Sequence, residues 1–500
     1  MNVGSLLLRC AQKWPAQNAV VDAHSGHVYS FVDFAQQVFG VGAALRERGL
    51  QEPERVAILG DNTPHYLLWD YGTMSAGLVR VPLDPSLSID EQAAQLADAQ
   101  ARLLVYGAEY AERARMLAAW LPGLELAPLE IDPATARREV MPYAMPAATA
   151  IASLNYTGGT TGEPKAVIIT HGSLTSALQN IVLGRGQLPG DVMINMRPIW
   201  PIAAIVVLAQ LAAGGSVVLA GKFHPTRFLE LLQAHKAAST SLVPTHLVRL
   251  MKETDPRAYD LSSLRVIDVG AAAIPPDTFM QAIEAFGPRI GIIYGLTEAS
   301  WTCYQEPSAL VDPASREQHI RTAGRPLFDN EVRIENDDGI AAAGVEGEVW
   351  IRGAHLAAGY WRRPELTAQV FVGGWFRSGD LGVLDDNGVL RITGRLKEVI
   401  RTGGKSVLPD EVERALCSFP GVLDAAAAGL PDPEWGEMIG ALVVVDPAAN
   451  VTAERLMEHC RTTLSSFKKP RLLMFAPTIP KSHYGKIQRA KVRALLLEEK

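Results

Sequence analysis

The chain has few cysteines and no long hydrophobic run, and each absence excludes a class of protein. Only four of its 500 residues are cysteine, and none of them forms a CxxC pair. This spacing argues against a disulfide framework and a zinc site. The most apolar stretch, residues 198–209, has 12 residues, whereas a membrane span needs about 20. We interpret it as a buried helix and expect a cytoplasmic protein without a membrane span or a signal peptide.

The chain also lacks an excess of positive charge. It has 47 Lys and Arg against 54 Asp and Glu, a formal net charge of −7. A broad basic surface, which nucleic acid or an anionic membrane would require, is therefore not expected. Any phosphate site must be local. A hydrophobic share of 48% is that of a globular protein, and the length predicts two to four domains of roughly 100–200 residues each.

Short apolar runs alternate with amphipathic stretches between Arg55 and Tyr294. This alternation predicts an α/β fold with doubly wound, mainly parallel sheets, in which ligands bind at the carboxyl ends of strands. A helix is predicted over residues 64–78. The predicted strands are 56–59, 103–106, 217–219, 241–243, 266–269 and 290–294.

The pattern changes after about residue 332. Strands are predicted at 332–334, 348–351 and 389–392, and Asp386-Asn387-Gly388 is a hairpin signal. This part predicts a β-rich subdomain, and the residues after Arg395 predict a compact α+β unit of about 100 residues. We therefore divide the chain into a large domain, 1–395, and a small domain, 396–500.

The most specific motif is Tyr-Thr-Gly-Gly-Thr-Thr-Gly-Glu-Pro-Lys at residues 156–165, between predicted strands 151–156 and 166–170. Its glycines let backbone N–H groups approach a polyanion, and its threonines and lysine add donors and charge. It is not the phosphate loop of kinases, because Pro164 precedes the lysine and no helix follows. For a bare GGTTG string, a glycine-rich hairpin turn stays an alternative. The candidate phosphate-binding residues are Thr157, Gly158, Gly159, Thr160, Thr161 and Lys165.

The ten-residue string resembles the signature of the adenylate-forming superfamily, which comprises acyl- and aryl-CoA synthetases, adenylation domains and beetle luciferases. The usual signature has Ser at the position of Gly158, and the glycine variant occurs in fatty acyl-CoA synthetases. The resemblance extends from Tyr29 to Arg489. It implies a large domain of doubly wound sheets with a β-rich subdomain, followed by a small mobile α+β domain.

The resemblance assigns roles to three further motifs that could otherwise be ordinary turns. Residues 294–298, Tyr-Gly-Leu-Thr-Glu, are similar to the adenine and magnesium motif, in which Glu298 would bind Mg²⁺. Asp380 in Ser-Gly-Asp is similar to the aspartate that binds the ribose, and Arg395 to its partner. The candidate nucleotide-binding residues are Tyr294, Gly295, Gly270, Ala271, Ala272, Asp380 and Arg395. Thr297, which would hold the α-phosphate, and Glu298 are candidate catalytic residues.

The remaining assignments lie in the small domain. Lys397 matches the hinge of the family, and Lys486 matches its catalytic lysine, although a lone terminal lysine is usually only a solvated charge. Residues that resemble coenzyme A contacts are Gly403, Gly404, Trp435, Phe467, Lys469 and Arg471. An ordinary basic patch and a flexible turn are the alternatives for this set.

The predicted acid pocket is apolar. The resemblance places Trp200, Pro201, Ile202, Leu296 and Trp301 in it. A histidine is usual where Pro201 stands, so the identity of the acid is open. No Phe-Asp pair is present to bind an α-amino group, which disfavours amino acids. We predict a hydrophobic aryl or medium-length aliphatic acid.

These assignments predict an enzyme that uses ATP, Mg²⁺ and coenzyme A to convert a small-molecule carboxylic acid, through an acyl-adenylate, into a thioester. Three alternatives stay open: a free-standing adenylation enzyme that loads a carrier protein, a non-catalytic nucleotide-binding homologue, and a luciferase-type oxidation. A monomer and a homodimer are both open.

Overall fold

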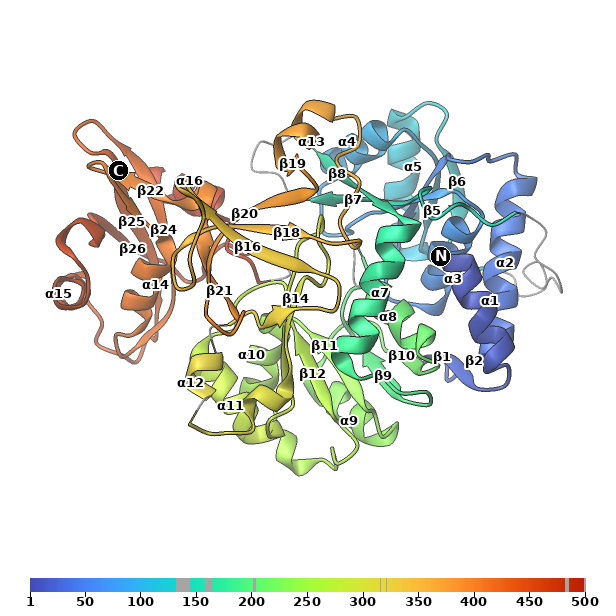
Figure 1. Ribbon diagram of the computed structural model, residues 1–500, viewed down its shortest axis with the longest axis horizontal. Coiled ribbons are helices and arrows are strands. Elements are labelled where there is room, and N and C mark those ends of the chain that lie inside the picture. Colours follow the sequence, from blue (N-terminus) through green and yellow to red (C-terminus); the bar gives the residue numbers. More distant parts are fainter. Residues whose placement is uncertain are drawn as a thin grey trace. The chain divides into compact units, whose positions relative to one another are not determined.

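The computed structural model describes residues 1–131, 144–157, 164–200, 204–314, 316–320, 322–481 and 485–498. The chain forms two compact units (Figure 1). Unit 1 comprises Met1–Glu331 and Ile351–Phe376, and unit 2 comprises Val332–Trp350 and Arg377–Lys500. The predicted boundary at residue 395 stays a prediction, because compactness does not show which segments move together.

Unit 1 contains a nine-stranded sheet with the order β15-β14-β13-β12-β11-β9-β10-β1-β2. The six strands from β13 to β1 are parallel to their neighbours, and β2, β14 and β15 are antiparallel. The central strands are buried along almost their whole length, as expected for a parallel sheet covered on both faces, although β11 is largely polar. The bounds are β1(Asn18–Asp22), β2(Val28–Ser30), β9(Val192–Asn195), β10(Ser216–Leu219), β11(Ser239–Leu242), β12(Val266–Val269), β13(Ile290–Tyr294), β14(Cys303–Gln305) and β15(Arg325–Pro326).

A second sheet of unit 1 has six strands in the order β6-β5-β3-β4-β7-β8. Its first five strands are parallel, and β8 is antiparallel to β7. In the sequence, the glycine-rich motif connects β7 to β8. The bounds are β3(Arg55–Leu59), β4(Val79–Pro82), β5(Ala101–Tyr106), β6(Glu125–Pro128), β7(Ile151–Thr157) and β8(Lys165–Thr170).

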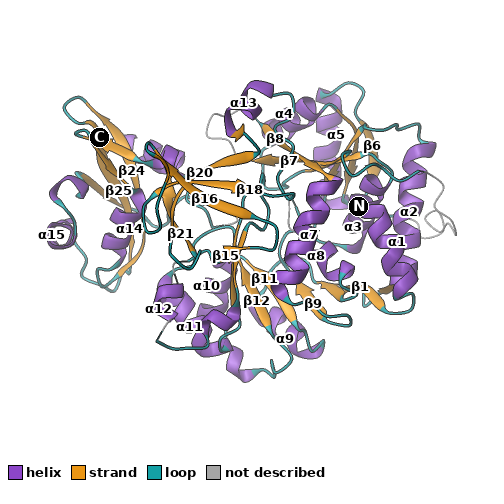
Figure 2. Ribbon diagram, viewed as in Figure 1, coloured by secondary structure: helices purple, strands orange, loops and turns teal. Residues whose placement is uncertain are grey.

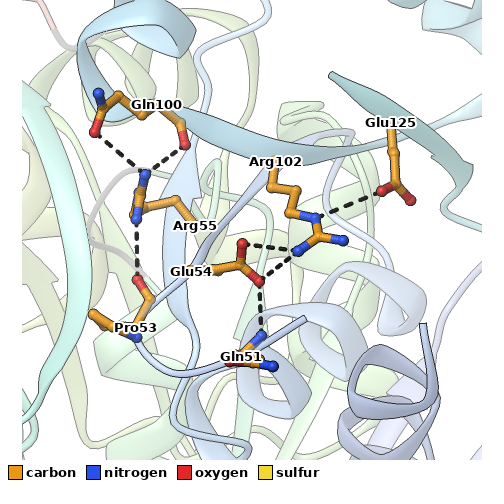
Figure 3. A network of polar contacts seen from close by, with 7 residues as sticks. All are labelled: Gln51, Pro53, Glu54, Arg55, Gln100, Arg102 and Glu125. Carbon is orange, nitrogen blue, oxygen red and sulfur yellow. Dashed lines mark hydrogen bonds and ion pairs between the residues drawn. The ribbon is translucent and has the colours of Figure 1, made fainter. Parts of the chain in front are cut away.

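A polar network joins three neighbouring strands of this second sheet (Figure 3). Arg102 on β5 contacts Glu54 at 2.9 Å and Glu125 on β6 at 3.6 Å. Arg55 on β3 donates to the carbonyl oxygens of Ala99 and Gln100 at 2.7 and 2.8 Å. These partly exposed contacts support the strand order, although each contributes only about 0–1 kcal/mol.

Helices pack against both sheets of unit 1 (Figure 2). Helix α3 begins with the N-cap Thr63 and Pro64, and α4 has a capping box formed by Ser88 and Glu91. Helices α1, α2 and α3 pack on one another. The helices of unit 1 are α1(Val3–Lys13), α2(Phe31–Glu47), α3(Pro64–Ser75), α4(Ile89–Ala99), α5(Ala111–Trp120), α7(His171–Arg185), α8(Ala204–Ala212), α9(Pro225–Ala234), α10(Pro244–Glu253), α11(Pro276–Phe286), α12(Arg316–His319) and α13(Pro364–Val370).

Two further sheets contain the strands of unit 2, and the first of them also includes β19(Phe371–Val372), whose residues belong to unit 1. One has the order β17-β16-β18-β20-β19 with β21 paired to β20, and the other has the order β23-β22-β25-β24 with β26 paired to β25. The bounds are β16(Glu331–Asn336), β17(Gly339–Ile340), β18(Gly347–Arg352), β19(Phe371–Val372), β20(Trp375–Leu384), β21(Leu390–Arg395), β22(Ile400–Thr402), β23(Lys405–Val407), β24(Val422–Asp432), β25(Gly436–Val445) and β26(Leu472–Phe475). The helices are α14(Pro409–Cys417), α15(Ala453–Thr463) and α16(Arg489–Glu498).

The predicted strands are confirmed, and one local prediction is wrong in part. Of the helix expected over residues 198–209, the structure describes α8 from Ala204 onward, whereas residues 198–200 lie outside a helix. Asp380 lies inside β20, directly after Gly379, which takes a φ of +69°. No described helix is both long and apolar enough to cross a membrane.

Candidate functional site

Two neighbouring parallel strands of unit 1 bring two predicted motifs to one edge of the nine-stranded sheet. Strand β12 ends at Val269 and is followed by the turn 270–272, and β13 ends at Tyr294 and is followed by 295–298. Val269 pairs with Ile292, so both carboxyl ends lie side by side. This is where doubly wound sheets bind ligands. A Cβ at Gly295 would lie 2.7 Å from the Trp301 amide nitrogen, so this position requires glycine.

Two residues with a strained backbone, Ala271 and Trp301, belong to the same edge. Five non-glycine residues of the described chain have a positive φ. Three of them are Ala271 at +78°, Trp301 at +56° and Arg362 at +53°. The first two belong to the predicted nucleotide and acid sites. Such conformations persist only where the surroundings enforce them, and they concentrate at functional sites.

Tyr360 connects the predicted metal-binding carboxylate with the predicted phosphate-binding lysine. Its hydroxyl donates to Glu298 Oε1 at 2.7 Å, and Glu298 is only 9% exposed. The Lys165 ammonium lies 5.0 Å from the centre of the Tyr360 ring, a cation–π contact. Burial, followed by the charge of Glu298, raises the pKa of Tyr360, so its hydroxyl stays a donor.

A second shared partner, Asp98, supports the entry to the glycine-rich loop. The hydroxyl of Tyr156 donates to Asp98 Oδ2 at 2.8 Å, and Trp361 Nε1 donates to the Asp98 carbonyl oxygen at 3.1 Å. Arg363 lies 3.6 Å from the same carboxylate. The segment 360–363 is therefore fixed against the last residues of β7. Thr157 ends β7 in register with Lys165. The predicted phosphate contacts Gly158, Gly159, Thr160 and Thr161 lie outside the described residues.

The predicted acid-pocket residues are partly described. Trp200 and Trp301 are 8% and 5% exposed and belong to one hydrophobic cluster, and Leu296 is half-buried. Pro201 and Ile202 lie outside the described residues. A small cavity of about 20 Å³ lies nearby, and its lining is partly polar. It is lined by Arg80, Ser153, Asn155, Ile169, Ser173, Leu174, Ala177, Ile205, Ser300 and His355.

The charged groups behind this cavity are buried. Arg80 Nε lies 2.6 Å from Asp70 Oδ1, and both side chains are almost fully buried. His355 Nε2 is 3.2 Å from the Thr302 hydroxyl. Burial lowers the pKa of His355 to about 4, so its imidazole is neutral at physiological pH.

In unit 2 the predicted ribose-binding residues form an ion pair. Asp380 and Arg395 face each other across the β20–β21 hairpin, with Arg395 Nε 3.0 Å from Asp380 Oδ1. Asp380 is buried, and its amide donates to the Ser378 hydroxyl at 3.0 Å. Lys397, the predicted hinge, lies in the short 3₁₀ helix η4(Leu396–Glu398) that follows Arg395.

Two aromatic–cation pairs of unit 2 contain residues that resemble coenzyme A contacts, and Lys405, which was not predicted, is the cation of the second pair. The Arg471 guanidinium lies 4.3 Å from the centre of the Trp435 ring, and Gly403 N donates to the Trp435 carbonyl oxygen at 2.9 Å. The Lys405 ammonium lies 4.3 Å from the centre of the Phe467 ring. Gly404 lies in the same turn as Gly403, and Lys469 is half-buried.

Lys486, the predicted catalytic lysine, has an exposed side chain in unit 2. An isolated antiparallel bridge between Lys481 and Ile487 closes the segment that carries it. The predicted site residues are thus divided between the two units. Tyr294, Thr297, Glu298, Lys165 and the turn 270–272 belong to unit 1, and Asp380, Arg395, Lys397 and Lys486 belong to unit 2.

The donor set fits Mg²⁺ bound together with phosphate. The described residues contain no group of three or more His, Cys, Asp or Glu side chains that could hold a metal ion. Mg²⁺ is commonly bound by one or two carboxylates plus substrate phosphates, and Glu298 supplies one carboxylate.

The sequence predictions missed Tyr360 and Asp98. The signal for Tyr360 was an aromatic residue after Gly359, which takes a φ of +132°. Asp98 gave no signal of its own, since it is one of several charged residues on α4.

Comparison with known proteins identifies the family. Residues 7–361 match the AMP-binding enzyme family and residues 411–486 match the AMP-binding enzyme C-terminal domain. Feruloyl-CoA synthase from Amycolatopsis sp is 33% identical over 98% of each chain. Among solved structures, the amide bond synthetase McbA from Marinactinospora thermotolerans has a TM-score of 0.90 at 30% identity, covering 99% of this chain and 100% of the other. ATP-bound MatB from Rhodopseudomonas palustris has a TM-score of 0.90 at 27% identity, covering 99% of each chain. The predicted fold class is confirmed, and the chain belongs to the AMP-binding enzymes, the adenylate-forming superfamily that its motifs resemble.

Proposed function

We propose that this enzyme activates a hydrophobic carboxylic acid with ATP to an acyl-adenylate and then transfers the acyl group to coenzyme A, releasing AMP and pyrophosphate. The observation that carries the proposal is the Glu298–Tyr360–Lys165 arrangement. In this arrangement the buried carboxylate of Glu298 and the ammonium group of Lys165 contact the same phenol, that of Tyr360. Lys165 is the last residue of the glycine-rich motif. The ATP-bound relative supports ATP as the nucleotide.

The first half-reaction brings two anions together. The substrate carboxylate attacks the α-phosphorus of ATP, and the bond to pyrophosphate breaks. Two like charges about 4 Å apart repel by roughly 4 kcal/mol at an effective dielectric of 20. Lys165 and the loop glycines offset the charge of the leaving pyrophosphate, and Lys486 offsets the charge where acid and α-phosphate meet. Glu298 would hold Mg²⁺, which would supply positive charge to the phosphates.

The second half-reaction needs a thiol acceptor. Coenzyme A carries phosphates and an apolar pantetheine arm, which match the cations and aromatic rings of the Trp435–Arg471 and Phe467–Lys405 pairs. The thiolate attacks the acyl carbonyl of the mixed anhydride, the bond to the phosphate oxygen breaks, and AMP leaves. No protein nucleophile is required.

The acid is an aryl or medium-length aliphatic acid. Trp200 and Trp301 bury large apolar surfaces in the cluster next to the predicted pocket. An aryl acid is also supported by the feruloyl-CoA synthase relative.

A panel of acids with ATP, Mg²⁺ and coenzyme A, scored by mass spectrometry of thioesters, tests the proposal. It contains ferulic, benzoic and octanoic acids. We expect thioesters from one class of acid and none from a Lys486→Ala variant, which still binds ATP. If Lys486→Ala exchanges pyrophosphate into ATP at the normal rate, the assigned role of this lysine is wrong.

A second candidate function is amide formation. It is favoured by the similarity to the Marinactinospora amide bond synthetase over the whole chain. In this case an amine takes the place of coenzyme A and the acyl-adenylate forms in the same way. If a panel of amines gives amide products and the release of AMP does not depend on coenzyme A, amide formation replaces thioester formation as the second half-reaction. A carrier-protein thiol is tested in the same assay.

A further inference from the structure

Arg489 connects three elements of unit 2 through one guanidinium. It is the first residue of α16 and stands three positions after Lys486. Its Nε donates to Glu398 Oε2 at 2.5 Å, and its Nη1 donates to the Ala427 carbonyl oxygen at 2.8 Å and to Glu413. The contacted residues belong to η4, β24 and α14. Arginine suits this position because its planar fork can serve several acceptors at once.

The three contacts of Arg489 are not equivalent. Glu413 is 8% exposed and also accepts a hydrogen bond from the Ala427 amide at 2.8 Å, so it belongs to the folded core of unit 2. The Glu398 side chain is 26% exposed and has no such second role among the described contacts. The Glu413 and Ala427 contacts therefore hold α16 in place, whereas the Glu398 contact adds a link to η4.

The segment before Arg489 is fixed at its base. Lys481 and Ile487 form an antiparallel bridge, and Gln488 N donates to the Pro480 carbonyl oxygen at 2.9 Å. The Lys481 ammonium contacts Asp424 Oδ2 at 2.5 Å. Gln488, in this base, directly precedes Arg489, and only two residues separate Lys486 from Arg489. The direction in which Lys486 projects therefore depends on where the guanidinium is held.

Glu398 is adjacent to Lys397, the residue predicted to be the hinge. We propose that Arg489 is a positioning residue, which links the segment that carries Lys486 to the hinge turn through Glu398. The link makes the lysine follow the hinge as one body during adenylation. This inference rests on the proposed function and extends it to two residues that the reaction itself does not touch.

Rates of the two half-reactions, measured separately, distinguish this positioning role from a purely structural one. Lys486 is needed when acid and ATP react, and it is not needed when a thiol attacks a preformed acyl-adenylate. A loosened link should therefore slow adenylation and spare thioester formation. A defect in the fold of unit 2 would slow both.

The test uses Glu398→Gln, which removes one charge, keeps the side-chain size and changes a partly exposed residue. We expect kcat for pyrophosphate exchange to fall about tenfold, with KM for ATP and acid changed less than about twofold. Thioester formation from coenzyme A and the synthetic adenylate of the best acid in the panel should stay at the wild-type rate, as should Tm. Glu458→Gln is the matched control, because Glu458 pairs with Arg461 at 2.5 Å within α15, away from the hinge.

Arg489→Lys provides a second variant. It keeps a cation for Glu413 but cannot reach two carboxylates in the same geometry, so it should show the same selective loss. Equal loss of both half-reactions in Glu398→Gln, or no loss in either, overturns the proposal. If the wild-type enzyme exchanges no pyrophosphate with any acid, the proposed function itself fails, and the positioning role fails with it.

Discussion

At the scale of single residues, the site depends on shared partners more than on isolated motif residues. Tyr360 contacts Glu298 and Lys165, and Asp98 contacts Tyr156 and the segment 360–363. A buried carboxylate without donors is costly, because its charge has lost water. The hydrogen bond from the Tyr360 hydroxyl therefore orients the Glu298 carboxylate and lowers the free-energy cost of burying its charge.

We expect Tyr360→Phe to weaken the use of Mg²⁺ and ATP. Loss of the hydroxyl leaves one oxygen of Glu298 without its donor, so the carboxylate turns away from the metal position. KM for MgATP should rise about tenfold, the size of one charge-assisted hydrogen bond. Pyrophosphate exchange measured against Mg²⁺ concentration checks this.

Tyr110→Phe is the control for Tyr360→Phe. It removes a comparable bond in the same unit, from the Tyr110 hydroxyl to Asp61 Oδ1 at 2.9 Å, between two residues without a predicted role in the site. If KM for MgATP changes equally in the two variants, Tyr360 acts only through the stability of the fold.

At the scale of elements, the backbone conformation of the β22–β23 hairpin affects the proposed coenzyme A site. Its two-residue turn, Gly403 and Gly404, takes φ values of +56° and +77°, as a type I′ turn requires. A Cβ on Gly403 would lie 2.5 Å from the Trp435 ring, whereas a Cβ on Gly404 would have no heavy atom within 4 Å. The two glycines share the same strain and differ in what they touch.

We expect Gly403→Ala to raise KM for coenzyme A at least about fivefold and to leave pyrophosphate exchange unchanged, because the methyl group displaces the Trp435 ring. Gly404→Ala carries the cost of a positive φ, roughly 1–2 kcal/mol, without that displacement. Thioester kinetics of both variants decide between the two effects. A similar KM in the two would mean that Trp435 does not contact coenzyme A.

At the scale of the whole molecule, buried titratable groups determine how stability depends on pH. Burial lowers the pKa of His355 and His171 to about 4 from an ordinary value near 6.5. The unfolded chain therefore binds these protons first as the pH falls. Stability should decrease between about pH 6.5 and pH 4, by up to about 3 kcal/mol for each histidine.

Three buried carboxyls act in the opposite direction. Burial raises the pKa of Asp70 to about 6 against the opposing charge of Arg80, and it also raises the pKa of Asp268 and Glu413. The folded state binds these protons first, which adds stability as the pH falls. Burial also lowers the pKa of His65 and His235, so these histidines act in the same direction as His355 and His171.

We expect His355→Gln to flatten the decrease of the unfolding free energy between pH 6.5 and pH 4. His24→Gln, at an exposed histidine, should leave the slope as it is. Urea unfolding at closely spaced pH values measures both. If the slope for His355→Gln equals that of the wild-type protein, His355 does not remain neutral in the folded state.

The sequence alone determined the strands, the α/β class and the family, because these follow from hydrophobic periodicity and from contiguous motifs such as residues 156–165 and 294–298. It could not place Tyr360, Asp98 or Arg489, since each acts through partners distant in sequence. Glu298 and Tyr360 are 62 positions apart, and Arg489 and Glu398 are 91 apart. Such contacts form only when strands and helices pack. The tertiary structure alone therefore decided which side chains form these hydrogen bonds, ion pairs and cation–π contacts.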